Sequence, residues 1–189
     1  MRIRAPCASV SPATAAVSSD MKTALLLAAA ALSLGAPQGA LLRAKPAPPV
    51  PAPAWALKDL DGNVVTSDQF KGKVVVLDFW ATWCGPCKSE IPGYVELQKK
   101  YASDGLAFVG ISVDQDGPEV VKKFVKEHGV NYTIVMADDA VVDAFAPIDG
   151  YPTTFIIDRD GFIRNKKLGS MPTAAYEKEI LAVLKPPAK

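Results

Sequence analysis

The sequence predicts an α/β fold in which helices cover both faces of a mixed central sheet, giving a three-layer sandwich. Three observations predict it. Residues 74–80 form an almost continuously apolar, β-branched run, which is typical of a central strand buried on both faces. Segments with strand and helix patterns alternate after this run. Two apolar runs joined by Asp160-Gly161 then predict a terminal hairpin, whose antiparallel strands make the sheet mixed.

The individual elements follow from local signals along the chain. Asp61-Gly62 between two short apolar stretches predicts a hairpin at 55–66, and the side-chain oxygens at 66–68 favour a short helical turn. Pro92 is expected to kink the helix that follows the central strand. The remaining expected elements are a helix at 86–101, a strand at 106–113, a helix at 118–128, a strand at 132–136, a short helix at 141–145, hairpin strands at 153–158 and 162–167, and a helix at 173–184.

Residues 1–40 are expected to form a leader rather than folded structure. Met21-Lys22 followed by an Ala- and Leu-rich run at 24–36 has the layout of a secretory signal, whose apolar core is short for a bilayer span. Translation is therefore expected to begin at Met21. Cleavage of the signal and its retention as an anchor both stay open, and both predict a periplasmic or other extracytoplasmic location. Residues 41–54, rich in Ala and Pro, are expected to be an extended linker to a domain at 55–189.

The charge balance argues against two classes of partner. The 189 residues include 21 Lys and Arg against 20 Asp and Glu, so the formal net charge is +1. Binding to nucleic acid or to an anionic membrane surface needs a basic patch. We therefore expect no nucleic-acid partner and membrane contact only through the N-terminal segment. The domain is expected to be a monomer.

Chemistry is expected at Cys84 and Cys87, the two cysteines of the domain. Because they lie three positions apart at the start of a helix, their side chains are close enough to form a disulfide. The small ring adds little stability, which favours reversible redox chemistry. The helix N-terminus favours the thiolate of Cys84, since lowering its pKa from about 8.5 to about 7 takes roughly 2 kcal/mol. Pro86 suits the first helical turn because it lacks an N–H.

Metal binding is the alternative interpretation of a Cys-x-x-Cys pair. A structural zinc site needs four ligands, and the domain offers one histidine and no further cysteine. Two thiolates alone can hold copper, but the bulky Trp83 beside them argues against that role. We expect no metal, and no cofactor other than the redox-active disulfide itself.

Two segments resemble the active site of thioredoxins. They are DFWATWCGPCK at 78–88 and YPTTF at 151–155, which looks like the cis-proline loop of that family. The N-terminal hairpin, an extra helix and strand between these two segments, and the Glu-Ile-Pro at 90–92 make the chain more similar to the TlpA/ResA-like branch than to plain thioredoxin. The resemblance implies a thioredoxin-like fold with an N-terminal hairpin and a helix-strand insertion.

The same resemblance implies an extracytoplasmic thiol:disulfide oxidoreductase that reduces disulfides of protein substrates, as in cytochrome c maturation, with a membrane-borne thiol electron donor. It implies that Cys84 attacks the substrate disulfide and that Cys87 resolves the mixed disulfide. It also implies a cis Pro152, which exposes the backbone of Tyr151 for pairing with the substrate. The implied substrate-binding surface is completed by Trp83, Gly85 and Pro86.

Two acidic residues near the cysteines carry different expectations. Asp78 lies within an apolar strand, where burial raises the pKa of a carboxyl. The resemblance implies that it handles the proton of Cys87, and a purely structural carboxylate is the alternative. Glu90 shares a helix face with Cys87; the resemblance implies that it tunes the cysteines, and a solvated charge is the alternative. Carrying both acids departs from the ResA-like pattern, so the division of proton transfer stays open. Gly110 aligns with the buried lysine of thioredoxin, so a lysine partner for Asp78 is not evident.

Three other functions compete with the reductase. A peroxiredoxin-like peroxidase needs a Pro-x-x-x-Thr-x-x-Cys arrangement, and Thr82-Trp83-Cys84 has neither that spacing nor the proline. A non-catalytic binding module of the same fold leaves the intact Cys-Gly-Pro-Cys unexplained. A disulfide-introducing oxidase is disfavoured because the Gly-Pro dipeptide resembles that of reducing thioredoxins.

The remaining polar and aromatic candidates are expected to be structural. His128 is expected to interact with the negative end of a helix. Residues 114–117 resemble a calcium loop but lack the later bidentate glutamate, so a plain loop is expected. Trp80 and Trp83 are expected to pack around the cysteines.

Overall fold

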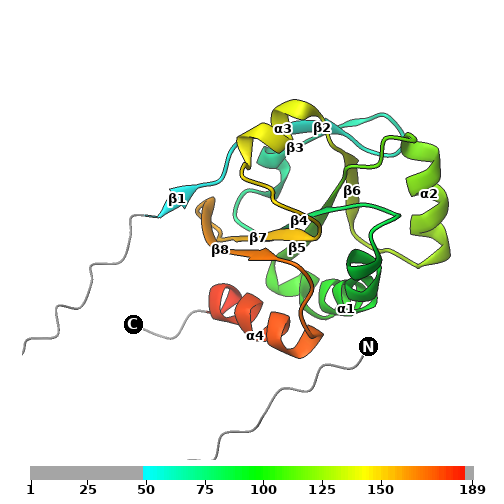
Figure 1. Ribbon diagram of the computed structural model, residues 1–189. Coiled ribbons are helices and arrows are strands. Elements are labelled where there is room, and N and C mark those ends of the chain that lie inside the picture. Colours follow the sequence, from blue (N-terminus) through cyan, green and yellow to red (C-terminus); the bar gives the residue numbers. More distant parts are fainter. Residues whose placement is uncertain (1–48, 186–189) are drawn as a thin grey trace, which may run out of the picture. The chain divides into compact units, whose positions relative to one another are not determined.

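A six-stranded mixed sheet forms the middle layer of the structure, a computed structural model that describes residues 49–185 (Figure 1). Strand β7 is antiparallel to both β4 and β8, whereas β4, β5 and β6 are parallel. This arrangement confirms the predicted α/β fold with a mixed sheet. In sheet order the strands are β1 (Val50–Pro51), β8 (Phe162–Leu168), β7 (Thr153–Ile157), β4 (Val74–Trp80), β5 (Leu106–Ser112) and β6 (Thr133–Met136).

Helices and a small hairpin cover the two faces of the sheet. Figure 1 shows α1 and α4 on one face, and α3 with the hairpin β2–β3 on the opposite face. These elements agree with the predicted ones to within a few residues at their ends, and Pro92 lies inside α1 without ending it. Their bounds are β2 (Ala56–Lys58), β3 (Val64–Thr66), η1 (Ser67–Phe70), α1 (Gly85–Tyr101), η2 (Ala102–Asp104), α2 (Pro118–Glu127), α3 (Asp139–Ala144) and α4 (Thr173–Leu184).

Side chains of strand β4 pack in different clusters of the hydrophobic core because successive side chains of a strand point to opposite faces. Its odd-numbered residues, 75 to 79, pack in the cluster that contains the hairpin β2–β3 and α3. Val74 and Val76 pack in the cluster that contains α1 and α4. Asp78 has the same parity as these two valines, so its carboxyl faces the helical layer of α1 and α4.

The first strand lies within the segment predicted to be an extended linker, residues 41–54. Val50 and Pro51 form β1 and pair with Ile163 and Phe162 of β8 at the edge of the sheet. Proline is tolerated there because an outer strand leaves one side of its backbone unpaired. The predicted leader at 1–40 and the first part of the linker lie outside the described residues. Over residues 49–185, no helix is long and apolar enough to cross a membrane.

Candidate active site

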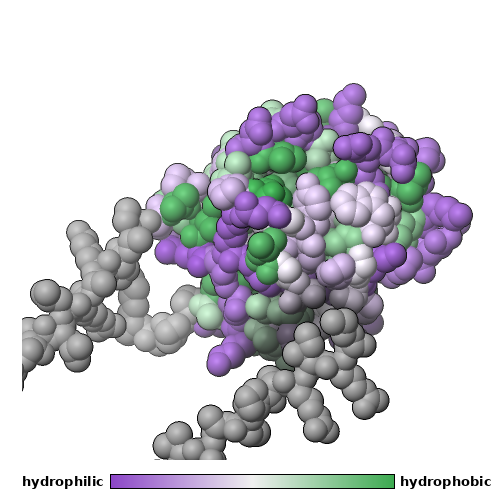
Figure 2. All heavy atoms as spheres, viewed as in Figure 1, coloured by the Kyte–Doolittle hydropathy of each residue, from purple (hydrophilic) through white to green (hydrophobic). Residues whose placement is uncertain are grey.

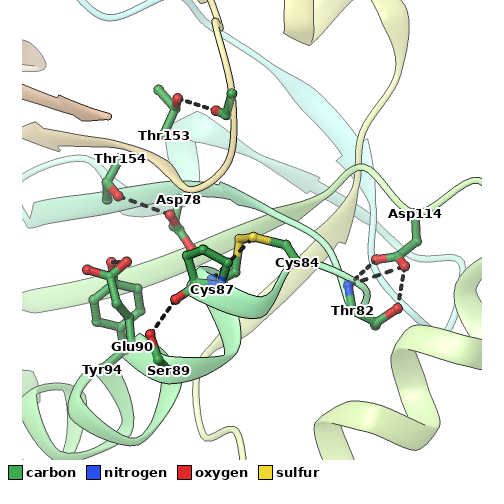
Figure 3. The surroundings of a disulfide bond; sticks show 12 residues. Asp78, Thr82, Cys84, Cys87, Ser89, Glu90, Tyr94, Asp114, Thr153 and Thr154 are labelled. Carbon is green, nitrogen blue, oxygen red and sulfur yellow. Dashed lines mark hydrogen bonds between the residues drawn. A yellow bond between two sulfur atoms is a disulfide. The ribbon is translucent and has the colours of Figure 1, made fainter. Parts of the chain in front are cut away.

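The cysteine pair lies where strand β4 leads into helix α1. The strand ends at Trp80, and the helix begins at Gly85 with Cys84 as its N-cap residue. Cys84 and Cys87 form a disulfide, with their Cα atoms 5.3 Å apart (Figure 3). The backbone N–H of Cys87 donates to Cys84 Sγ at 3.2 Å, so a donor of the first helical turn contacts this sulfur. The predicted position of the pair at the start of a helix is confirmed.

The surface beside the two buried cysteines is exposed and partly apolar. Gly85 and Pro86 are exposed, and Trp83 has 61% of its surface accessible. The Trp83 ring meets the edge of Tyr151, with ring centroids 6.0 Å apart. The expected packing role is therefore correct for Trp80, which is buried, and wrong for Trp83. Figure 2 shows other hydrophobic side chains exposed among hydrophilic ones on the face drawn in Figure 1.

The loop that contains Tyr151 and Pro152 lies beside the cysteine turn. The peptide bond between these two residues is cis, as predicted. The carbonyl of Pro152 accepts a hydrogen bond from the N–H of Gly169 at 2.8 Å, and the Thr153 hydroxyl donates to the Gly150 carbonyl at 2.6 Å. These bonds, with the contact between Tyr151 and Trp83, fix the loop next to the start of α1.

The turn before the cysteines is held by Asp114, a residue that the sequence placed in a plain loop. Its buried carboxylate accepts hydrogen bonds from the N–H of Thr82 at 2.9 Å and from the Thr82 hydroxyl at 2.5 Å (Figure 3). The Ser112 hydroxyl donates to the same carboxylate at 2.8 Å. Asp114 thus links the end of β5 to the turn at the end of β4. The signal that pointed to it was polar residues directly after a buried strand.

Asp78 is the buried acid beneath the disulfide. It is 5% exposed, and the Thr154 hydroxyl donates to its Oδ1 at 3.0 Å. Figure 3 shows its carboxyl between Thr154 and the cysteine pair. Burial, assisted by the negative charge of Glu90, raises the pKa of Asp78 to about 8. The expectation of a raised pKa is confirmed, and Asp78 ionises within the range where thiols also exchange protons.

Glu90 is buried as well, so the alternative of a solvated surface charge is wrong. Its side chain is 4% exposed. Its Oε1 accepts from Lys167 Nζ at 2.5 Å and from the N–H of Met171 at 2.9 Å, while its Oε2 accepts from the Tyr94 hydroxyl at 3.0 Å. Sequence reasoning missed Lys167, which lies on β8 with 9% of its side chain exposed. The available signal was the alternation over the last residues of β8, which places Lys167 on the same face as Asn165.

Gly110, which aligns with the buried lysine of thioredoxin, lies in a crowded part of the sheet. Gly110 lies opposite Asp78 in the register of β4 and β5. A Cβ atom on Gly110 would lie 2.8 Å from Trp80 Nε1 and 2.7 Å from Ile134 Cδ1, which is closer than real contacts. A side chain there would have to displace Trp80 or Ile134, and the cation of this site reaches the acids from β8 instead.

Potential metal ligands do not cluster in the part of the chain that the structure describes. Over residues 49–185, no group of three or more His, Cys, Asp or Glu side chains is arranged to hold a metal ion. His128 ends helix α2, where its Nδ1 lies 2.9 Å from the carbonyl of Phe124 and its ring stacks on that of Phe124. His128 therefore interacts with the last turn of a helix, as expected.

Comparison with known proteins places the site in a family. The sequence matches the Redoxin family over residues 47–184, which include every residue of the site described above. The chain belongs to the redoxin family. Two relatives of this redoxin come from Bacillus subtilis (strain 168). The thiol-disulfide oxidoreductase ResA is 35% identical over 136 residues, 71% of this chain and 74% of ResA. The thioredoxin-like protein YneN is 35% identical over 131 residues, 68% of this chain and 76% of YneN.

Solved structures agree with this assignment. A thiol:disulfide interchange protein of the thioredoxin family from Chlorobium tepidum TLS superimposes on this redoxin with a TM-score of 0.68 and 37% identity. The match covers 73% of this chain and 98% of that one. The predicted membership in the TlpA/ResA-like branch is confirmed. This redoxin is a thiol-disulfide oxidoreductase.

Proposed function

We propose that this redoxin reduces disulfide bonds of protein substrates through Cys84 and Cys87. The observation that supports the proposal most is the placement of the pair at the N-terminus of α1, where Cys84 Sγ accepts an N–H of the first turn. A helix N-terminus stabilises a thiolate, which is the nucleophile in disulfide exchange. The two cysteines are only three positions apart, so their disulfide closes a small ring. Such a ring adds little to stability, which favours reversible exchange.

The exchange has two steps in this proposal. The Cys84 thiolate attacks one sulfur of the substrate disulfide, and the other substrate sulfur leaves as a thiolate. The Cys87 thiol then loses its proton and attacks Cys84 Sγ, which releases the second substrate sulfur. Two electrons have passed to the substrate, which becomes a dithiol, and the protein is left with the disulfide that the structure shows. A membrane-borne thiol donor is proposed to supply the two electrons for the next cycle.

Asp78 is proposed as the acceptor of the Cys87 proton. A general base works best when its pKa lies near the working pH, and the pKa of Asp78 is raised to about 8 by burial and by Glu90. A purely structural role for the Asp78 carboxylate, the alternative, would not require a pKa near the working pH. Glu90 is proposed to tune the site through its charge, because three donors hold its carboxylate in place.

The substrate is proposed to bind across the exposed surface around Cys84. Trp83 offers an exposed aromatic face, and Gly85 and Pro86 leave the approach to the sulfur free of large side chains. The backbone of the loop at Tyr151 and Pro152 lies alongside and offers main-chain groups to an extended substrate segment. Both sides of this surface are fixed by the Trp83–Tyr151 contact.

Location and partners belong to the same proposal and rest on the sequence. The signal-like segment at 21–36 supports export, with the domain reached through the Pro-rich residues 41–54. Cytochrome c maturation is the proposed setting, since it needs disulfide reduction outside the cytoplasm. A phosphatase that is active only under oxidising conditions, fused after Pro53, should be active in a bacterial host. A reporter that stays inactive would refute export.

The direction of electron flow is tested by the reduction potential of the purified protein. Oxidising and reducing members of this fold lie near about −120 and −270 mV, a difference of roughly 7 kcal/mol. We expect a value below roughly −200 mV, together with reduction of a protein disulfide in the presence of a thiol donor. A value near the oxidising limit would make the protein an oxidase. If Cys84→Ser and Cys87→Ser both still reduced the substrate, the cysteines would not be catalytic, and a binding module would be indicated instead.

A further inference from the structure

The ion pair between Lys167 and Glu90 is unusual because both side chains are buried. They are 9% and 4% exposed, and the two charged atoms lie 2.5 Å apart. Removing two charges from water is unfavourable unless geometry and further hydrogen bonds compensate for it. The next residue on the strand, Leu168, is 57% exposed. The strand therefore buries a lysine and exposes a leucine, which neither core packing nor solubility explains.

The register of the sheet places this lysine in line with the redox site. Lys167 pairs with Thr154 across β8 and β7, and Thr154 pairs with Asp78 across β7 and β4. The Thr154 hydroxyl also donates to Asp78. The three residues thus form one row across adjacent strands. Lys167 and Asp78 are two strands apart in this row, which corresponds to roughly 9 to 10 Å between their backbones. Glu90 covers this row from helix α1.

The other groups around the two acids carry no charge. Three tyrosines face the row: Tyr94 of α1, Tyr132 just before β6, and Tyr176 of α4. Burial raises the pKa of each hydroxyl above its ordinary value of 10, so all three are neutral. The charges that act on Asp78 are those of Glu90, which raises its pKa, and Lys167, which lowers it. Two buried carboxyls and one buried cation therefore share the space below the disulfide.

We propose that Lys167 is a positioning residue of the redox site: it binds Glu90 and holds that carboxylate beside the row, which leaves Asp78, whose partner is the Thr154 hydroxyl, as the acid that exchanges a proton. This inference rests on the proposed function, because it assigns the proton-transfer role to one of two neighbouring acids. The charge of Lys167 lowers the pKa of Asp78, so without this cation the ionisation of Asp78 should move to higher pH.

Lys167→Met tests this role because it keeps the length of the side chain and removes its charge. The carboxyl ionisation of the site should move up by about one pH unit or more. If Asp78 accepts the proton of Cys87, the fraction of ionised acceptor at pH 7 then falls about tenfold, and the resolving step should slow by a similar factor. Lys166→Met is the matched control, since Lys166 is the neighbouring exposed lysine on the opposite face of β8.

Two readouts are needed, so that failure of this inference is separated from failure of the proposed function. Infrared difference spectra of the oxidised protein follow the protonated carboxyl against pH without any exchange reaction, and Asp78→Asn assigns the band. Stopped-flow measurements follow resolution of a mixed disulfide. A parent protein that exchanges no disulfides overturns the proposed function, whereas the infrared titration still decides the role of Lys167.

A double-mutant cycle decides whether Lys167 acts through Glu90. In the Glu90→Gln background, Lys167→Met should have a smaller effect on the carboxyl ionisation, because only its direct through-space action on Asp78 remains. Lys167→Arg keeps the charge and should follow the parent profile if the pocket accepts the larger group. An unchanged pH profile in a folded Lys167→Met, or an effect of the same size in the Glu90→Gln background, would overturn the proposal.

Discussion

Replacing Asp78 with asparagine is expected to stabilise the oxidised protein, by an amount that grows as the pH rises. Burial and the charge of Glu90 raise the pKa of Asp78 from its ordinary value of 3.8 to about 8 in the folded state. The unfolded chain therefore releases this proton near pH 4, while the folded protein keeps it until about pH 8. Between these values the folded state binds more protons, so the free energy of unfolding falls as the pH increases.

The size of the effect follows from the two pKa values. Each tenfold change in proton affinity corresponds to about 1.4 kcal/mol, so the ionisable Asp78 lowers the free energy of unfolding by roughly 6 kcal/mol above pH 8, relative to pH 4. Asparagine does not ionise, and its side-chain oxygen can still accept the hydrogen bond of Thr154. The variant and the parent should thus be similar near pH 4 and differ by several kcal/mol at pH 9.

Urea unfolding of the oxidised protein at several pH values between 4 and 9 measures this difference. Asp116→Asn is the control, because Asp116 is an exposed carboxyl in the loop after β5. It should show no comparable gain. A difference between Asp78→Asn and the parent that stays constant from pH 4 to 9 would show that Asp78 does not hold its proton in the folded state. The same variant should also slow the resolving step several-fold and leave initial attack little changed.

Three further predictions follow from the site. Cys87→Ser should accumulate mixed disulfides with substrate proteins and Cys84→Ser should accumulate few, as seen on non-reducing gels; equal trapping would contradict the assigned nucleophile. Asp114→Ala should lower the free energy of unfolding by about 1–3 kcal/mol, because buried donors lose their acceptor, and should slow exchange, whereas Asp116→Asn should do neither. Trp83→Ala should raise KM for a protein substrate several-fold with an unchanged reduction potential, since the ring is exposed; a shifted potential with an unchanged KM would refute a binding role.

The parts of the fold that depend on local patterns were predictable from the sequence. The central strand is the longest apolar β-branched run, and β4 has the predicted bounds. The terminal helix and the two Asp-Gly hairpins were likewise found from signals within a few residues. Strand β1 was not, because a Pro-rich segment carries no strand pattern of its own. It forms only through pairing with β8, more than a hundred residues further along the chain.

The reacting sulfurs and the buried acid could also be predicted, because a Cys-x-x-Cys pair and an acid inside an apolar strand are local signals. The partners of the acids could not. Lys167 and Glu90 are separated by 77 positions, and Asp114 and Thr82 by 32. Which of them meet depends on sheet register and on how α1 packs on the sheet, and neither is visible in a single sequence.

The position of Lys167 on β8 distinguishes the roles of the two buried acids, Asp78 and Glu90. A lysine at position 110 would lie beside Asp78 itself, but any side chain there would have to displace Trp80 or Ile134. The cation comes instead from β8, where Lys167 contacts Glu90 directly and Asp78 only through space. Glu90 therefore has a charged partner, whereas Asp78 has a neutral hydroxyl donor, that of Thr154. A carboxyl held by a cation favours its charged form, and a carboxyl held by a hydroxyl in an apolar layer favours its proton. This asymmetry is the physical reason for our proposal that the transferable proton is carried by Asp78 rather than by Glu90.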